Sequence, residues 1–303
     1  MGLRLQRQPL LPRLVLINPR FTRHGYRSRH GAVPSRGARL RPREMTTRLC
    51  PDSPLVARFA PSPNYGERRG YGRPNCLILH YTGMPTGEAA LEALTDPACE
   101  VSAHYLVWED GSIDQLVAER DRAWHAGRGS WKGESDLNSA SIGIEIVNPG
   151  HEGGSPPFPD CQIEATIALA RDIAARWSIA PERILAHSDI APARKRDPGE
   201  VFPWAALWRS GVGHWTEPAS LTGSPLFAHE EEGAPVRALQ AMLALYGYGV
   251  EITGIYDRQT RQVVTAFQRH FRPERVDGEA DASTAATLKA LIDGLAAGLA
   301  PSV

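Results

Sequence analysis

The chain has 303 residues, enough for about two globular domains, and 42% of them are hydrophobic, which is typical of a folded protein rather than a disordered one. Its formal net charge of zero combines two unlike parts: residues 1–44 carry eleven arginines and one acidic residue, Glu44, whereas the remainder carries 23 basic and 33 acidic side chains. An acidic body argues against nucleic acid as the main partner.

The N-terminal segment, residues 1–54, is rich in arginine and proline and has little helical periodicity. Its one apolar stretch, 14–17, is too short for the apolar region of a secretory signal peptide or for a membrane span. We expect this segment to be a disordered tail, or sequence translated from a start upstream of a natural first residue at Met45. A basic arm that binds nucleic acid or a membrane surface is the alternative.

Strands and helices mix between residues 55 and 210. The predicted strands are the apolar or β-rich runs 75–81, 102–108, 112–117, 141–147 and 183–186. The Asp-Gly dipeptide at 110–111 predicts a hairpin between the second and the third of them. The predicted helices are 88–94, 163–177 and 203–208. We therefore predict an α/β domain at 55–210, with a central mixed sheet flanked by helices.

The longest of these helices has a predicted buried stripe at helical spacing. Its members are Ile163, Ile167, Ala170, Ala174 and Trp177. The chain also has four cysteines, at positions 50, 76, 99 and 161, and none forms a Cys-x-x-Cys pair. A cysteine metal site is therefore not expected, and Cys76 and Cys161, which lie beside apolar runs, are predicted to be buried or half-buried.

A second region begins after residues 211–228, which are rich in glycine, proline and serine and are predicted to be a linker. An apolar helical stripe at 236–243 opens this region, which we place at 229–295. It contains no evident nucleophile or metal cluster, so binding is expected of it rather than catalysis.

Two copies of a Gly-x-x-Asp-x-x-Thr pattern follow that stripe, at 254–260 and 278–284. In each copy an aspartate, Asp257 or Asp281, precedes a helical pattern and can cap its free N–H groups. The second region is therefore predicted to be a small all-α unit of three helices.

Three residues of metal-ligand type come from separate stretches. His80 and His187 each end an apolar run, and Asp197 follows ten residues after His187. Two histidines and one carboxylate can hold zinc while a fourth position stays open for water. Glu145, an acid inside an apolar run, could act as the base for that water, with Lys195 as a neighbouring cation.

Each of these residues also has an ordinary explanation. A histidine at a strand end is more often a hydrogen-bonded polar group than a ligand, and His104, His125 and His151 are available as well. Glu145 could pair with an arginine, and Lys195 could belong to a solvated basic loop. The same ligand types also suit a non-haem iron oxygenase, although there one histidine and the acid normally stand close together near the start of the set.

Five ordered motifs carry a specific resemblance. The matching stretches are 79–82, 101–107, 123–127, 138–145 and 186–199. Through them, residues 55–210 resemble the zinc-dependent N-acetylmuramoyl-L-alanine amidases of the type 2 amidase family, which includes bacterial recycling and envelope enzymes. The C-terminal unit resembles the three-helix type of peptidoglycan-binding domain, with markers that include Gln240, Gly247-Tyr248 and Gln268.

The resemblance implies a zinc ion held by His80, His187 and Asp197. It implies Glu145 as the residue that handles the water proton and Lys195 as the cation that steadies the oxyanion. The implied reaction is hydrolysis of the amide between the lactyl group of N-acetylmuramic acid and L-alanine. Four further residues at family positions are candidates for the wall of the substrate cleft: His104, Trp124, His125 and Asn138. The first three are equally candidates for the sheet core.

The complete set of five disfavours the alternative of another class, a non-catalytic peptidoglycan-binding or sensing protein. The expected partner is peptidoglycan or a muropeptide, and nucleic acid is not expected as a partner. The chain is expected to be monomeric and to have no transmembrane segment. The appended binding unit favours polymer and the bacterial cell envelope, whereas the absence of a visible signal peptide favours the cytoplasm and small 1,6-anhydro-muropeptides. Compartment and substrate form therefore stay open.

Overall fold

The structure is a computed structural model that describes residues 51–221, 224–227 and 229–297, with side chains as far as Leu295. The predictions for the N-terminal segment fall almost wholly outside these residues. All of the described residues belong to one compact unit. Among them, no helix has both the length and the apolar character needed to cross a membrane.

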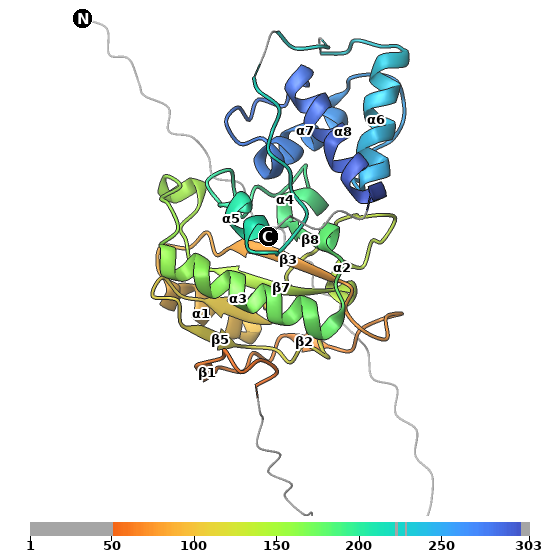
Figure 1. Cartoon of the computed structure of the whole chain (residues 1–303). Coiled ribbons are helices and arrows are strands. Elements are labelled where there is room, and N and C mark those ends of the chain that lie inside the picture. Colours follow the sequence, from red (N-terminus) through yellow and green to blue (C-terminus); the bar gives the residue numbers. More distant parts are fainter. Residues whose placement is uncertain (1–50, 222–223, 228, 298–303) are drawn as a thin grey trace, which may run out of the picture. The chain divides into compact units, whose positions relative to one another are not determined.

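A six-stranded mixed sheet forms the centre of the first region, as predicted (Figure 1). Its strands are β1 (Arg58–Phe59), β3 (Cys76–Tyr81), β4 (Tyr105–Val107), β5 (Ile113–Gln115), β7 (Ser141–Ile146) and β8 (Ile184–Ala186). They lie in the order β1-β5-β4-β7-β3-β8, and β5 runs antiparallel to β4 in the predicted hairpin, while the other pairs are parallel. A separate antiparallel pair joins β2 (Tyr65–Gly66) to β6 (Arg122–Ala123).

Helices cover both faces of the sheet. Figure 1 shows α3 (Asp160–Trp177) lying across one face. Alternate residues of β4 face opposite ways, so Val107 packs in the same core as α3, whereas Leu106 packs with Leu94 of α1 (Gly87–Thr95). The shorter helices of this region are α2 (Leu137–Ala140), α4 (His187–Ile190), α5 (Trp204–Arg209) and the 3₁₀ turns η1 (Pro97–Cys99), η2 (His151–Gly153) and η3 (Pro181–Arg183).

The buried face of α3 is rotated from the predicted one. Its buried members are Gln162, Ile163, Thr166, Leu169, Ala170 and Ile173. The predicted members Ile167, Ala174 and Trp177 are only half-buried, at the edges of this stripe. Apolar side chains occur on more than one side of the helix, so only contact with the sheet decides which side is covered.

The two cysteines predicted to be buried have different environments. Cys76 in β3 is fully buried, as predicted, whereas Cys161 is exposed, which corrects the prediction for it. Cys161 lies in the first turn of α3, on the side away from the sheet, and its thiol donates to the carbonyl of Glu109. Apolar neighbours in the sequence do not decide the face of a helix on which a residue lies.

The C-terminal region contains α6 (Ala234–Tyr246), α7 (Arg258–Phe271) and α8 (Ala282–Ala297), which lie together in Figure 1. The predicted caps are confirmed. The Asp257 carboxylate accepts from the backbone N–H of Thr260 at 2.8 Å, and Asp281 accepts from that of Thr284 at 2.7 Å. The same local device therefore starts both of the later helices.

The hydrophobic core runs without a break from the sheet region into these helices. Val212 and Trp215, at the start of the predicted linker, are buried, and the Trp215 indole N–H donates to the carbonyl of His270. The domain boundaries at residues 210 and 229 stay a prediction, but the two regions pack as parts of a single unit.

Candidate metal centre and active site

The three predicted ligands meet at one edge of the sheet. His80 is on β3, and His187 is the first residue of α4, directly after β8. β3 and β8 are parallel neighbours, and Leu79 pairs with Ala186. The residues that follow these two, His80 and His187, therefore lie at the same edge of the sheet. Asp197 reaches the same edge from a loop, and its backbone carbonyl accepts the backbone N–H of Ser188 at 3.0 Å.

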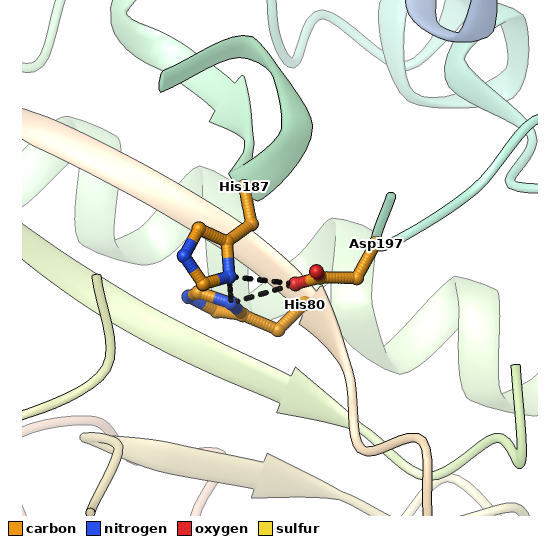
Figure 2. Close-up of side chains that lie close together, drawn as sticks. All are labelled: His80, His187 and Asp197. Carbon is orange, nitrogen blue, oxygen red and sulfur yellow. Dashed lines mark hydrogen bonds and ion pairs between the residues drawn. The ribbon is translucent and has the colours of Figure 1, made fainter. Parts of the chain in front are cut away.

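The ligand atoms of these three residues face one another (Figure 2). His80 Nδ1 lies 2.9 Å from His187 Nδ1 and 3.0 Å from Asp197 Oδ2, and His187 Nδ1 lies 2.9 Å from the same oxygen. All three side chains are buried. Two imidazole nitrogens and one carboxylate oxygen that converge on a point form a donor set suited to zinc.

Hydrogen bonds on the far side of each ring determine which nitrogen carries the proton. His187 Nε2 lies 3.0 Å from the carbonyl of Ala126, which can only accept, so in the neutral ring Nδ1 holds the lone pair. A metal-binding histidine needs that lone pair, and its other N–H is commonly held in this way.

His80 is oriented by a chain of three groups. The Ser141 hydroxyl donates to the carbonyl of Leu137, so it can accept from His125 Nε2 at 3.4 Å. His125 Nδ1 is then free to accept from His80 Nε2, 3.0 Å away. His80 Nδ1 therefore presents its lone pair to the other two ligands, as a metal site requires.

The charges of the set also fit a cation. Burial together with the nearby His187 lowers the pKa of His80 to about 4, which keeps the ring neutral at pH 7. Burial by itself raises the pKa of Asp197, but the charge and hydrogen bonds of His187 and His80 outweigh it and hold that pKa well below its usual range. The set thus offers the neutral His80 nitrogen and an anionic oxygen of Asp197, with His187 Nδ1 beside them.

Glu145 stands beside the metal set because of strand register. On β7 it pairs directly with His80 of β3, so both side chains lie on the same face of the sheet. Its Oε2 atom is buried and has no hydrogen-bond partner among the described residues. Burial and the nearby Asp197 raise the pKa of Glu145 well above its ordinary value, while the charge of Lys195 opposes this. A cation at the site would lower the pKa of Glu145, as the charge of Lys195 does.

A cavity of about 380 Å³ opens over these groups on the α1 side of the sheet. Its polar lining includes His80, Glu145, His187 and Asp197, together with the consecutive bases Arg194, Lys195 and Arg196. Trp124 and His125, two of the predicted cleft residues, line it as well. The cavity therefore combines a metal-type donor set, a half-buried acid and a basic rim.

His104 and Asn138 are not among the residues that line this cavity. His104 is fully buried between the backbone N–H of Gly143 and the carbonyl of Asp121, the core position that was its other expected place. Asn138 Oδ1 accepts the backbone N–H groups of His125 and Ala126 at 3.0 and 2.7 Å. Asn138 thus holds the segment that contacts the two histidine ligands, and the His104 ring packs edge-on against His125.

Sequence reasoning missed Gly143 and Ser141 on β7. A β-carbon at Gly143 would lie 2.5 Å from the His125 ring, so only glycine lets that ring pack on the strand. Ser141 orients the same ring, as described above. The signal in the sequence is the pair of small residues within an otherwise apolar strand, and it becomes informative only when the neighbour is known.

Comparison with known proteins agrees with this geometry. A family model described as N-acetylmuramoyl-L-alanine amidase matches residues 70–200, and one for a peptidoglycan binding domain matches residues 232–288. N-acetylmuramoyl-L-alanine amidase AmiD of Escherichia coli strain K12 is 43% identical over 237 residues, which cover 74% of this chain and 84% of that protein. The 1,6-anhydro-N-acetylmuramyl-L-alanine amidase AmpD of Enterobacter cloacae is 34% identical over 166 residues, 49% of this chain and 87% of that protein.

Solved structures give the same result for the fold. The complex of E. coli AmiD with the substrate anhydro-N-acetylmuramic acid-L-Ala-D-gamma-Glu-L-Lys has a TM-score of 0.63 at 39% identity, and the match covers 76% of this chain and 97% of that one. AmpDh3 from Pseudomonas aeruginosa in complex with anhydromuramic pentapeptide has a TM-score of 0.61 at 34% identity, covering 75% of this chain and 94% of that one.

Proposed function

The chain belongs to the N-acetylmuramoyl-L-alanine amidase family, and from this premise we propose that it is a zinc-dependent enzyme that cuts the amide between the lactyl group of N-acetylmuramic acid and L-alanine. It is an N-acetylmuramoyl-L-alanine amidase, and its proposed role is to act on muropeptides in cell-wall recycling. The observation that carries the zinc proposal is the convergence of His80 Nδ1, His187 Nδ1 and Asp197 Oδ2 within 3.0 Å of one another.

The proposed substrate is a muropeptide that begins with 1,6-anhydro-N-acetylmuramic acid. Two relatives with this fold are solved with anhydromuramic peptides bound, and the complex of E. coli AmiD is with a substrate. The basic side chains Arg194, Lys195 and Arg196 on the cavity rim are suited to the carboxylates of a stem peptide. A non-catalytic binding protein is set aside, because the relatives that match most of the chain are amidases.

The metal site would be made by His80, His187 and Asp197, all three of which line the cavity, and three protein ligands of these types would leave a position open for water. A zinc ion there supplies positive charge that polarises a carbonyl and acidifies water. The protein's own part is to keep both rings in the Nδ1 lone-pair form, through the carbonyl of Ala126 and the ring of His125.

Glu145 is proposed as the base and then the acid of the reaction. Glu145 lines the cavity beside His80, where its carboxyl group can take a proton from the attacking water. The same carboxyl can pass this proton to the nitrogen of the departing L-alanine. Proton transfer by a positioned side chain contributes about 100- to 10,000-fold to a rate.

Lys195 is proposed to stabilise the negative charge that develops on the carbonyl oxygen. Its ammonium group lines the cavity and acts electrostatically on both His80 and Glu145. Loss of one such donor typically lowers a rate by about 100- to 1000-fold. The C-terminal helices are proposed to bind peptidoglycan, on the strength of the family match at 232–288.

The test is a digest of purified anhydro-muropeptides and of purified peptidoglycan, read by mass spectrometry. The full chain is assayed as purified, after removal of metal with EDTA, and after zinc is restored. We expect free peptides that begin with L-alanine, lost with EDTA and regained with zinc. The relative rates on the two substrates also determine which form the enzyme prefers.

Two results would contradict the proposal. Equal release of peptide by the EDTA-treated chain, with metal analysis showing no zinc, would refute the dependence on zinc. Cleavage at another bond, seen as peptides that lack N-terminal L-alanine, would refute the assigned reaction.

A further inference from the structure

Asp189 is a fully buried acid that lies just outside the cavity and has no part in the proposed chemistry. Its carboxylate contacts three groups. The first is the backbone N–H of Ala186, which donates to Oδ2 at 2.8 Å. The others come from the C-terminal region: the hydroxyl of Tyr248 donates to Oδ1 at 2.7 Å, and His270 Nδ1 lies 2.7 Å from Oδ2. Two of its three partners therefore belong to the helical unit.

The helix that Asp189 belongs to also carries a metal ligand. α4 has only four residues, beginning with His187, and the backbone N–H of Ser188 in it holds the carbonyl of Asp197 at 3.0 Å. A single helical turn is not stable by itself. The position of two of the three ligands therefore depends on what packs against α4.

A second line of contacts leads from the helical unit to the other ligands. Arg269 Nε lies 3.5 Å from the Glu200 carboxylate, which in turn lies 3.1 Å from His151 Nε2. His151 Nδ1 contacts the hydroxyl of Tyr81 at 3.0 Å, and Tyr81 follows His80 in β3. Glu200 follows Asp197 by three residues. The adjacent α7 residues Arg269 and His270 thus reach all three ligand-bearing segments.

The turn after α6 completes the contact between the helical unit and the sheet region, which we call the seam. The carbonyl of Gly247 accepts the backbone N–H of Lys132 at 2.8 Å, and a β-carbon at Gly247 would lie 2.6 Å from the ring of Trp131. A β-carbon at Gly249 would lie 2.8 Å from Ser130, whose backbone N–H donates to the last carbonyl of α4. The backbone of both glycines packs directly against the side chains of Trp131 and Ser130 with no room for a β-carbon, which is expected of a fixed contact between the two regions.

We propose that the C-terminal helical unit is a positioning element of the metal centre, in addition to any role in binding peptidoglycan. Tyr248, Arg269 and His270 hold α4 and the 197–200 loop so that the ligand atoms converge. The inference rests on the proposed zinc site. Partners that orient metal ligands from the outside typically change metal affinity by about 10- to 100-fold, and we expect that range here.

The test measures the zinc affinity of the full chain by competition with a chromophoric chelator of known affinity. Tyr248→Phe removes one hydroxyl and keeps the ring, and Arg269→Ala removes the ion pair with Glu200. The matched controls are Tyr65→Phe and Arg258→Ala, at exposed positions. We expect each seam variant to bind zinc about 10-fold more weakly and the double variant more weakly still, with both controls unchanged.

A variant in the helical core separates positioning from general stability. Leu288→Ala removes a fully buried side chain of α8, a helix that contains none of Tyr248, Arg269 and His270, so it should lower the unfolding temperature and leave zinc affinity unchanged. If the seam variants lower the unfolding temperature in the same way but bind zinc as the unmodified chain does, the inference is wrong. If the unmodified chain itself binds no zinc, the proposed metal site fails, and this inference fails with it.

Discussion

Buried polar side chains are used differently in the C-terminal helices and in the sheet region. In the helices, Gln240 and Gln268 are fully buried and occupy equivalent places before the two copies of the repeated pattern. Gln240 Oε1 accepts from the N–H of Gly254 and its Nε2 donates to the carbonyl of Ile255. Each end of the buried amide has a partner, so the glutamine closes the loop that precedes α7.

Gln268 repeats this arrangement in the second copy. Its Oε1 accepts from the N–H of Gly278, and its Nε2 donates to the carbonyl of Glu279. At the edge of the sheet, by contrast, Glu145 Oε2 is buried without a partner among the described residues, and the atoms of three ligands face one another. At these places the satisfied glutamines stabilise the fold, whereas the unpartnered carboxylate oxygen of Glu145 belongs to the residue proposed to carry the proton.

The sharpest test of this contrast is Glu145→Gln, which removes the ionisable group and keeps the shape of the side chain. Turnover should fall by about 100- to 10,000-fold, because the proton carrier is lost. Zinc content should stay at the level of the unmodified chain, and the free energy of unfolding should not fall, since no hydrogen bond to Oε2 is lost. Peptide release, metal analysis and urea unfolding measure the three quantities, and near-normal turnover would show that Glu145 is not the base.

The converse variant is Gln240→Leu. It should lower the free energy of unfolding by about 1–3 kcal/mol for each buried group left without a partner, such as the N–H of Gly254. Leu245→Gln, at a 68% exposed position of the same helix, is the control, with an expected change within about 0.5 kcal/mol. Zinc affinity should not change in either. If the Gln240→Leu chain is as stable as the control, the buried glutamine does not stabilise the fold, and the contrast does not hold.

His125 lies between the two classes, because it is fully hydrogen-bonded and yet acts on a ligand. His125→Ala should weaken zinc binding by about 10- to 100-fold, since His80 loses the group that fixes its protonated nitrogen. His125→Asn, which can place an acceptor near the former Nδ1 position, should recover part of the loss. His229→Ala, at an exposed histidine, is the control. Equal zinc affinity in all three would remove His125 from the metal site.

The smallest expected effect is on stability as the pH is lowered. In the metal-free protein, burial together with the charge of Arg68 lowers the pKa of His104 to about 3, and burial lowers that of His80 to about 4. Both lie below the unfolded value of about 6.5, so the unfolded chain binds more protons and stability is lost as the pH falls below about 6.5. Each histidine contributes up to about 1.4 kcal/mol per pH unit.

Urea unfolding of the metal-free chain between pH 7 and pH 5 measures this slope, above the range in which ordinary carboxyl groups titrate. NMR titration of the histidine rings gives the individual groups, and His104 should stay neutral at pH 5. A His104 ring that protonates near pH 6.5 would contradict its burial in the core.

Much of the sheet could be predicted because its central strands are parallel and buried on both faces. Such strands are continuous apolar runs in the sequence, and 75–81, 141–147 and 183–186 became β3, β7 and β8. The Asp-Gly hairpin and the aspartate caps were also predictable, because each depends on residues only a few positions apart. Where a signal is local, the sequence is sufficient.

The predictions that failed concern which side of an element a residue occupies. Cys161 lies on a side of α3 that is exposed, and Ile167, Ala174 and Trp177 pack only at the margin of the core. Apolar periodicity indicates that a helix or strand has a buried face, but the partner that buries it is distant in the sequence.

The sequence by itself determined the family, the strand and helix types and a short list of polar residues, since motifs and local patterns carry that information. Only the tertiary structure decided that His80 pairs in register with Glu145, that His125 orients His80, and that Asp189 is held by Tyr248 and His270. Each of these depends on contacts between segments far apart along the chain. Their geometry is set by strand pairing and core packing, which no local stretch of sequence encodes.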